Sequence, residues 1–75
     1  MWHDAKTNPP KYYEHVLLFI HIWYEVEGKK YDKEYMIEGY YHKDNVYCDW
    51  MGESFEEQET CLAWSDLPEK PRKEK

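Results

Sequence analysis

An alternation of apolar side chains from Val16 to Val26 is the strongest pattern in the chain. Every even position is apolar, and these are Val16, Leu18, Ile20, Ile22, Tyr24 and Val26. The odd positions mix apolar and polar side chains, and these are His15, Leu17, Phe19, His21, Trp23 and Glu25. A period of two, with many β-branched and aromatic residues, is typical of a strand with one buried face. We therefore predict a strand whose even side chains form the core and whose odd face is half covered, by another element or by a partner.

Shorter segments predict three further strands: Tyr35–His42, Val46–Met51 and Thr60–Trp64. The lysine-rich residues 27–34 predict a hairpin loop after the first strand, and Asp44 with Asn45 predicts a tight turn. Residues 15–51 are therefore expected to form a three-stranded antiparallel meander. Gly39, inside the second strand, indicates a bulge or the close approach of another backbone.

The acidic segment before the last strand is open to two interpretations. Ser54 is followed three residues later by Glu57, which is the spacing of a capping box at the start of a helix. The segment is too short to form a stable helix by itself. A single helical turn over Ser54–Gln58 and an irregular loop therefore both remain open.

Both ends of the chain are expected to run as extended straps. Pro9 and Pro10 break regular structure near the beginning, and Pro68 and Pro71 deny a helix to the closing segment. Trp64 is expected to pack on the core and to anchor the closing strap, with the opening strap crossing the same face of the sheet. The prediction is a mainly β fold: an antiparallel meander of about four strands, with a single domain over residues 1–71 and a disordered tail over 72–75.

Charge is distributed unevenly over the 75 residues, whose net charge is −6. Six lysines and seven acidic residues nearly balance over residues 1–43, whereas residues 44–69 contain eight acidic residues and no Lys or Arg. This balance argues against direct binding to nucleic acid, which needs clustered cations. A solvated acidic surface and a surface that docks on a basic partner are both consistent with it. Because so short a chain buries only a thin core, a homodimer is also plausible.

No segment of the sequence predicts a signal peptide or a membrane span. The first residues lack an apolar segment, and the longest apolar run, Val16–Ile20, is far too short to cross a bilayer. We therefore expect a cytoplasmic protein with no membrane contact. In that compartment Cys48 and Cys61 are expected to be reduced, partly buried thiols, although a bridge between them stays open.

Enzymatic and metal chemistry find little support in the spacing of reactive residues. The histidines His3, His15, His21 and His42 form no close ligand pair with each other or with the cysteines. The serines Ser54 and Ser65 lack a glycine-rich elbow, and the three glycines form no phosphate loop. We predict a protein that is not an enzyme and that needs no metal or cofactor.

The two ends, taken together, resemble a family of small phage and prophage proteins that is catalogued as domain of unknown function 551. The resemblance is carried by Trp2, Pro9-Pro10, Val16-Leu17-Leu18, Glu38-Gly39-Tyr40-Tyr41 and a closing Trp64-x-x-Leu67-Pro68-x-x-Pro71. It covers about residues 2–71. The sequence departs from the family pattern at Ala63, where a histidine is common, and in lacking a leucine before the opening proline. The resemblance implies a phage or prophage origin within a host cell and a β-rich fold, and it brings no catalytic residues.

Binding to a host protein, such as one of host defence, is the function we expect. Large aromatic residues anchor protein interfaces, and an acidic surface can imitate the phosphate charge that a basic, nucleic-acid-binding groove recognises. The candidate residues for protein binding are Leu17, Phe19, Trp23, Asp49, Glu53, Glu56, Glu57 and Glu59. The competing interpretation of the first three is that they cover a small second core beneath the N-terminal segment.

An alternative function is the sequestration of a nucleotide signal in an aromatic pocket, in an oligomer. Ring faces stack on any base, but phosphates also need cations. The candidate residues are Tyr40, Tyr41, Tyr47, Trp50 and Lys43, with the hairpin lysines Lys29, Lys30 and Lys33 as further cations. A purely structural or interaction module remains a third possibility.

Overall fold

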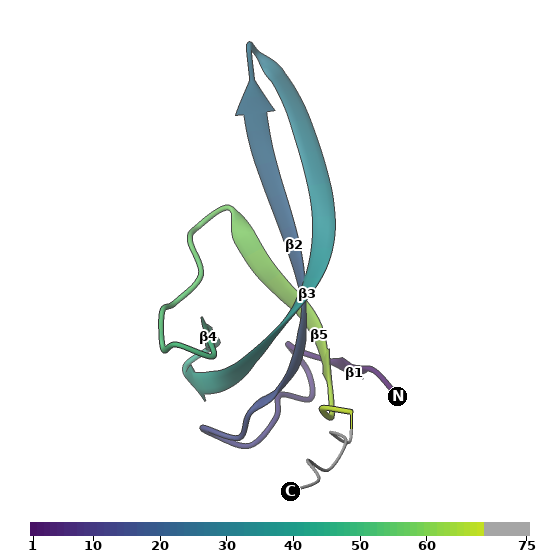
Figure 1. The fold of residues 1–75 in the computed structure, drawn as a ribbon, viewed down its shortest axis with the longest axis vertical. Coiled ribbons are helices and arrows are strands. Elements are labelled where there is room, and N and C mark those ends of the chain that lie inside the picture. Colours follow the sequence, from purple (N-terminus) through teal and green to yellow (C-terminus); the bar gives the residue numbers. More distant parts are fainter. Residues whose placement is uncertain (69–75) are drawn as a thin grey trace, which may run out of the picture.

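The structure is a computed structural model that describes residues 1–68 as one curled antiparallel sheet (Figure 1). Its five strands follow the order β1-β5-β2-β3-β4 across the sheet. Their bounds are His3–Asp4 for β1, Val16–Val26 for β2, Lys29–Lys43 for β3, Val46–Asp49 for β4 and Glu59–Ser65 for β5. The prediction of a mainly β, antiparallel fold is confirmed. No helix among the described residues is long and apolar enough to cross a membrane.

The strands β2 and β3 form the longest hairpin, and its turn is only two residues long. Glu27 and Gly28 both have positive φ, at 50° and 82°, which is the backbone of a type I′ turn that matches strand twist. The prediction of a loop over residues 27–34 is therefore wrong, because β3 already begins at Lys29, opposite Val26. The charged residues of this segment are exposed on a strand, where Lys30 is the partner of Glu25.

The end of this hairpin projects from the sheet as a two-stranded arm (Figure 1). We define the arm as residues 23–32, because the pairing of β5 with β2 ends at Ile22. Tyr24 and Tyr31 stack on each other in the arm with ring centroids 5.6 Å apart. They are 41% and 45% exposed. The predicted core face of β2 is thus correct through Ile20 and wrong at Tyr24 and Val26, because no third strand supports the arm.

The predicted meander is confirmed for β2, β3 and β4, and a tight turn at Asp44 and Asn45 joins the last two. Both turn residues have positive φ, and short polar side chains tolerate this conformation best. The last strand does not extend the meander. Instead β5 returns across the molecule to pair with the free edge of β2, and β1 pairs with β5.

The sheet encloses its core on the inner side of the curl. Val16, Leu18 and Ile20 are at most 1% exposed. Tyr47 on β4 donates its hydroxyl hydrogen to the carbonyl of Ala5, just after β1, at 2.7 Å. This bond joins segments from the two opposite edges of the sheet, so the curl nearly closes around the core. Half-buried Tyr35, Ile37, Phe55, Cys61 and Trp64 complete the packing.

Residues 54–58 form no helical turn, so the loop interpretation holds. Ser54 makes an antiparallel bridge with Cys48. The carboxylate of Asp49 accepts backbone hydrogen bonds from Met51 at 2.9 Å and from Glu53 at 3.0 Å. These bonds hold the turn just before residues 54–58 and fold the chain back along β4.

The opening and closing segments meet, although not as two straps on one face. The opening segment contributes β1, which pairs with β5 and adds an edge strand to the sheet. Half-buried Trp64 donates its indole hydrogen to the carbonyl of Asn8 at 2.7 Å and packs against the tilted ring of His3, with ring centroids 4.4 Å apart. Trp64 therefore fastens the first residues to the sheet, and its packing against the core confirms that part of its predicted role. Pro71 and the predicted tail over 72–75 lie outside the described residues.

Gly39 allows β4 to approach β2, which confirms the predicted close contact of backbones. A Cβ atom at this position would overlap the carbonyl oxygen of Cys48 and lie 2.6 Å from Leu18 Cδ1. The space is thus closed on one side by the backbone of β4 and on the other by the fully buried side chain of Leu18.

We predict that Gly39→Ala lowers the free energy of unfolding by at least about 3 kcal/mol, because neither neighbour can move without opening the curl. Gly28→Ala is the matched control. The space around Gly28 is open and only its positive φ opposes a side chain, so the expected cost there is about 1–2 kcal/mol. Urea unfolding of both variants measures the difference, and an equal or smaller cost at Gly39 contradicts the role assigned to it.

Candidate functional site

The outer face of the sheet carries the candidate protein-binding residues of β2. Leu17 and Phe19 alternate with the core residues, so they point away from the core. Phe19 is the direct register partner of Met36 on β3 and of Ala63 on β5. Trp2 covers the same face, with its ring centroid 5.7 Å from that of Phe19. We name Trp2, Leu17, Phe19, Met36 and Ala63 the outer patch.

The outer patch is partly open to solvent, with Leu17, Phe19 and Ala63 half-buried. Met36 is 59% exposed and Trp2 is 45% exposed. Because residues 1–68 form a single sheet, no second layer of this segment covers its outer face. Of the interpretation of Leu17, Phe19 and Trp23 as a second small core beneath the N-terminal segment, the structure shows the contact between Phe19 and Trp2.

Trp23 lies on the same outer face, but on the arm. It is four residues beyond Phe19, about 13 Å along the strand. The Lys30 ammonium lies 5.4 Å from the Trp23 ring centroid. The structure therefore separates this third predicted anchor from the outer patch, and a partner that contacts both must lie along the hairpin.

The predicted acidic residues divide into internal ligands and exposed charges. Asp49 holds the turn after β4, as described above. Glu59 accepts a hydrogen bond from the hydroxyl of Tyr35, on the inner side of the sheet, and one from the Glu56 amide at 3.2 Å. The carboxylates of Glu53, Glu56 and Glu57 remain exposed on the loop between β4 and β5. Only these three are placed to form an acidic docking surface.

A shallow aromatic cleft lies at the end of the outer face, beyond the outer patch. We name it the aromatic cleft. Its volume is about 290 Å³, and the residues that line it are Tyr13, His15, Tyr40, Trp50, Met51 and Gly52. His15 stacks on Tyr40 with centroids 5.2 Å apart, and Tyr13 lies 5.9 Å from Tyr40. These three rings form one wall, and the turn at residues 50–52 forms the other.

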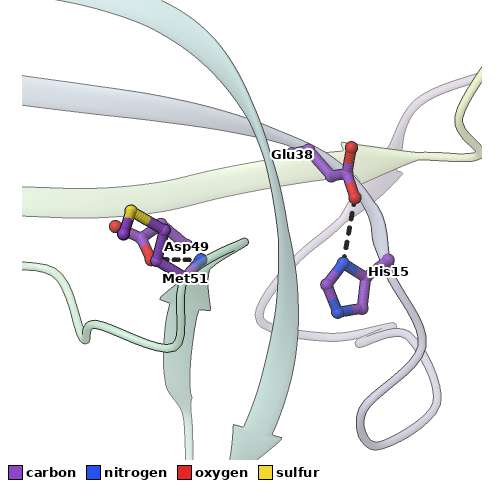
Figure 2. Close-up of polar contacts among 4 residues, drawn as sticks. All are labelled: His15, Glu38, Asp49 and Met51. Carbon is purple, nitrogen blue, oxygen red and sulfur yellow. Dashed lines mark hydrogen bonds and ion pairs between the residues drawn. The ribbon is translucent and has the colours of Figure 1, made fainter.

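Two short polar contacts hold the walls of the cleft. Figure 2 shows His15 Nδ1 bonded to Glu38 Oε2, at 3.0 Å, beside the β3 strand. It also shows the bond between the Met51 amide and the Asp49 carboxylate. On the first wall, Tyr13 has a φ of 64° and donates its amide hydrogen to the Tyr41 carbonyl at 2.9 Å. A left-handed tyrosine costs about 1–2 kcal/mol, and here it directs the ring over Tyr40.

The structure brings together only part of the predicted nucleotide site. Tyr40 and Trp50 both line the aromatic cleft, whereas Tyr41 and Tyr47 are 7% and 8% exposed and belong to the core. Lys43 does not line the cleft, and none of the other hairpin lysines does. A base can stack there, but no Lys or Arg lines the cleft to hold a phosphate.

A second cavity, of about 400 Å³, opens on the inner side at the seam of the curl. It is lined by Ala5, Lys6, Asn45, Val46, Tyr47, Ser54, Phe55, Glu59, Thr60 and Cys61. Burial raises the pKa of the Cys61 thiol to about 11, so this thiol stays protonated at neutral pH and is a poor nucleophile. Cys48 is buried, and both cysteines are free. Among residues 1–68, no three His, Cys, Asp or Glu side chains are grouped as metal ligands.

Three contributors to the outer face escaped the sequence patterns. Met36 lies between two residues of the inner face, Tyr35 and Ile37, and only its register with Phe19 shows its role on the outer face. Trp2 belongs to the opening segment, for which the sequence predicts only an extended strap. Tyr13 precedes the predicted strands, and its left-handed backbone leaves no sequence signal.

Comparison with protein-family models, with curated proteins and with solved structures finds no match to this chain. The resemblance to the phage family described above therefore stays a prediction.

The contact between Tyr35 and Glu59 predicts a pH dependence of stability. Burial, and after it the hydrogen bond and charge of Glu59, raises the pKa of Tyr35 from 10.0 to about 12. The folded state thus favours the neutral phenol. Its contribution to stability is present below pH 10 and is lost as the pH rises through about 10 to 12.

We expect Tyr35→Phe to reduce the loss of stability that wild type shows between pH 9 and pH 11.5, because phenylalanine has no proton to release. The exposed Tyr31→Phe on the arm serves as the control and should keep the wild-type profile. Urea unfolding at the two pH values measures the change. Identical profiles for Tyr35→Phe and wild type contradict the assignment.

Proposed function

We propose that the protein is a non-enzymatic binding protein that attaches to a protein of the host cell through the outer face of its sheet. The observation that carries this proposal is the outer patch: a contiguous apolar surface on a sheet with no second layer within residues 1–68. Exposed apolar surface of this kind is typical of an interaction site.

The composition of the outer patch supports a protein partner. Trp2 and Phe19 are large rings that are already in contact, so they lose little side-chain entropy when a partner covers them. Aromatic residues and methionine are enriched in protein interfaces. Charged residues flank the patch on β3, where Glu34 lies two positions before Met36 and Glu38 two positions after it, on the same face. An apolar centre with a polar rim is the usual anatomy of an interface.

The phage or prophage origin, and with it an action against host defence, stays part of the proposal. It is supported by the closing Trp64-x-x-Leu67-Pro68 pattern, of which the structure describes Trp64 and Leu67 as half-buried. The exposed Glu53, Glu56 and Glu57 would supply attraction to a basic partner, and the complex should then weaken with salt.

A matched pair of charge substitutions tests the proposal. Met36→Glu places a carboxylate at the centre of the outer patch, whereas Val26→Glu places one at the exposed tip of the arm. Both change the net charge equally at an exposed strand position. We expect Met36→Glu to weaken partner capture from host lysate at least about 10-fold, because a charge in a desolvated interface centre is costly.

The melting temperatures of both variants should stay close to that of wild type, since neither side chain is buried. Val26→Glu should capture the partner as wild type does. Capture that is equal for all three proteins, or absent for all three, contradicts binding through the outer patch.

A further inference from the structure

The aromatic cleft stands next to the outer patch on the same face, and its chemistry differs. The patch is aliphatic and aromatic, whereas the cleft is formed by ring faces and is bordered by carboxylates. Tyr40 connects the two regions, because it follows Glu38 and Met36 at the outward positions of β3. A partner that covers the patch therefore also reaches the cleft.

Both walls of the cleft are held in place before any ligand arrives. The Asp49 carboxylate accepts hydrogen bonds from the backbone amides of Met51 and Glu53. The Gly52 amide donates a hydrogen bond to the Asp49 carbonyl at 2.9 Å. This turn presents Trp50, which is 58% exposed. On the other wall, the amide of Tyr13 is bonded to β3 despite its positive φ. Retained backbone strain at an exposed aromatic residue is typical of a functional position.

The shape of the cleft depends on Gly52. Its φ is +91°, and a Cβ there would lie 3.3 Å from the Tyr40 hydroxyl oxygen. A side chain at this position would crowd the Tyr40 ring edge and narrow the entrance. Glycine thus keeps the space between the Tyr40 wall and the Trp50 turn open.

The charges around the cleft favour a cation, because His15, the one basic side chain among the described residues that line it, is already paired with Glu38. No Lys or Arg lines it, and residues 44–68 contain seven acidic residues and no basic one. Glu38 is bonded to His15 at one wall, and Asp49 precedes Trp50 at the other. Aromatic ring faces attract cations, most strongly when the site is partly desolvated. A phosphate or carboxylate would meet the opposite field.

We propose that the aromatic cleft binds the guanidinium group of an arginine side chain of the protein partner. A guanidinium is planar, stacks on aromatic faces and is weakly hydrated, so it suits an open cleft with ring walls better than the compact lysine ammonium does. The inference rests on the proposed function for the source of this arginine, but not for the chemistry of the cleft.

Titration of the full-length protein with N-acetyl-arginine methylamide, followed by two-dimensional NMR, tests the proposal directly. We expect saturable shifts at Tyr40, Gly52 and the Trp50 indole, with millimolar affinity. The isosteric citrulline derivative, which lacks the charge, should bind several-fold more weakly, and adenosine monophosphate should not compete. Equal binding of citrulline, preferential binding of the nucleotide, or no shift at the cleft up to about 50 mM arginine derivative overturns the proposal.

Two variants, one at a tryptophan and one at a tyrosine, test whether the arginine derivative binds in the cleft. Trp50→Ala removes an exposed ring of the cleft, and we expect this substitution to lower the affinity for the arginine derivative about 3- to 10-fold. Tyr12→Ala is the matched control, because Tyr12 is 62% exposed, is adjacent to Tyr13 and faces Tyr41 outside the cleft. It should leave the affinity unchanged. Unchanged affinity for Trp50→Ala overturns the assignment, provided that both variants keep the wild-type spectrum elsewhere.

The two proposals fail in different ways. If arginine binds the cleft while Met36→Glu captures the partner normally, the cation site stands and binding through the outer patch fails. If Met36→Glu abolishes capture while arginine does not bind, the reverse holds. If both proposals are correct, Trp50→Ala should also reduce capture, and excess arginine derivative should reduce capture by wild type but not by Trp50→Ala.

Discussion

Burial of the inner side chains of β2 is the interaction on which the rest of the structure depends. Val16, Leu18 and Ile20 are the most deeply buried large side chains, and each contributes about 1.5–3 kcal/mol by leaving water. In a domain whose total stability is expected to be a few kcal/mol, these three are indispensable. β2 has paired strands on both sides, β3 on one and β5 on the other. The sheet can curl around β2 only because Gly39 has no side chain.

The exposed outer face is a direct consequence of that core. In a strand, successive side chains point to opposite sides, so the burial of Leu18 places Leu17 and Phe19 outside. The cross-strand register then adds Met36 and Ala63 at the same level. A shift of one residue in register would exchange the two faces. The surface that we propose for binding is therefore determined by the same pairing that builds the core.

The arm and the aromatic cleft lie at opposite ends of this face and differ in how they are held. The arm is a two-stranded ribbon with half-exposed Tyr24 and Tyr31, and such ribbons are only marginally stable by themselves. The cleft is held by the Asp49 turn and by the backbone bond of Tyr13. Preorganisation of this kind reduces the entropy lost on binding, which favours the cleft over the arm as the site of specific recognition.

Local patterns were sufficient to predict much of the fold. The alternation of β2, the turn at Asp44 and Asn45 and the close approach at Gly39 all follow from nearest-neighbour preferences of the backbone. The prediction of a loop over residues 27–34 failed because lysine and glutamate were interpreted as solvent-exposed loop residues. In the structure they are exposed on a strand, since Glu27 and Gly28 are sufficient for the turn.

The sequence by itself determined the mainly β class of the fold, the inner face of β2 through Ile20, the uneven charge and the presence of Leu17 and Phe19 on the opposite face. Only the tertiary structure decided that β5 pairs with β2, that Trp2 and Met36 join the outer patch, and that Tyr13, Tyr40 and Trp50 share a cleft while Tyr41 and Tyr47 are buried. The physical reason is the range of the interactions. Alternation and turn preferences act between neighbours in the chain, whereas these contacts depend on which distant strands meet and in which register.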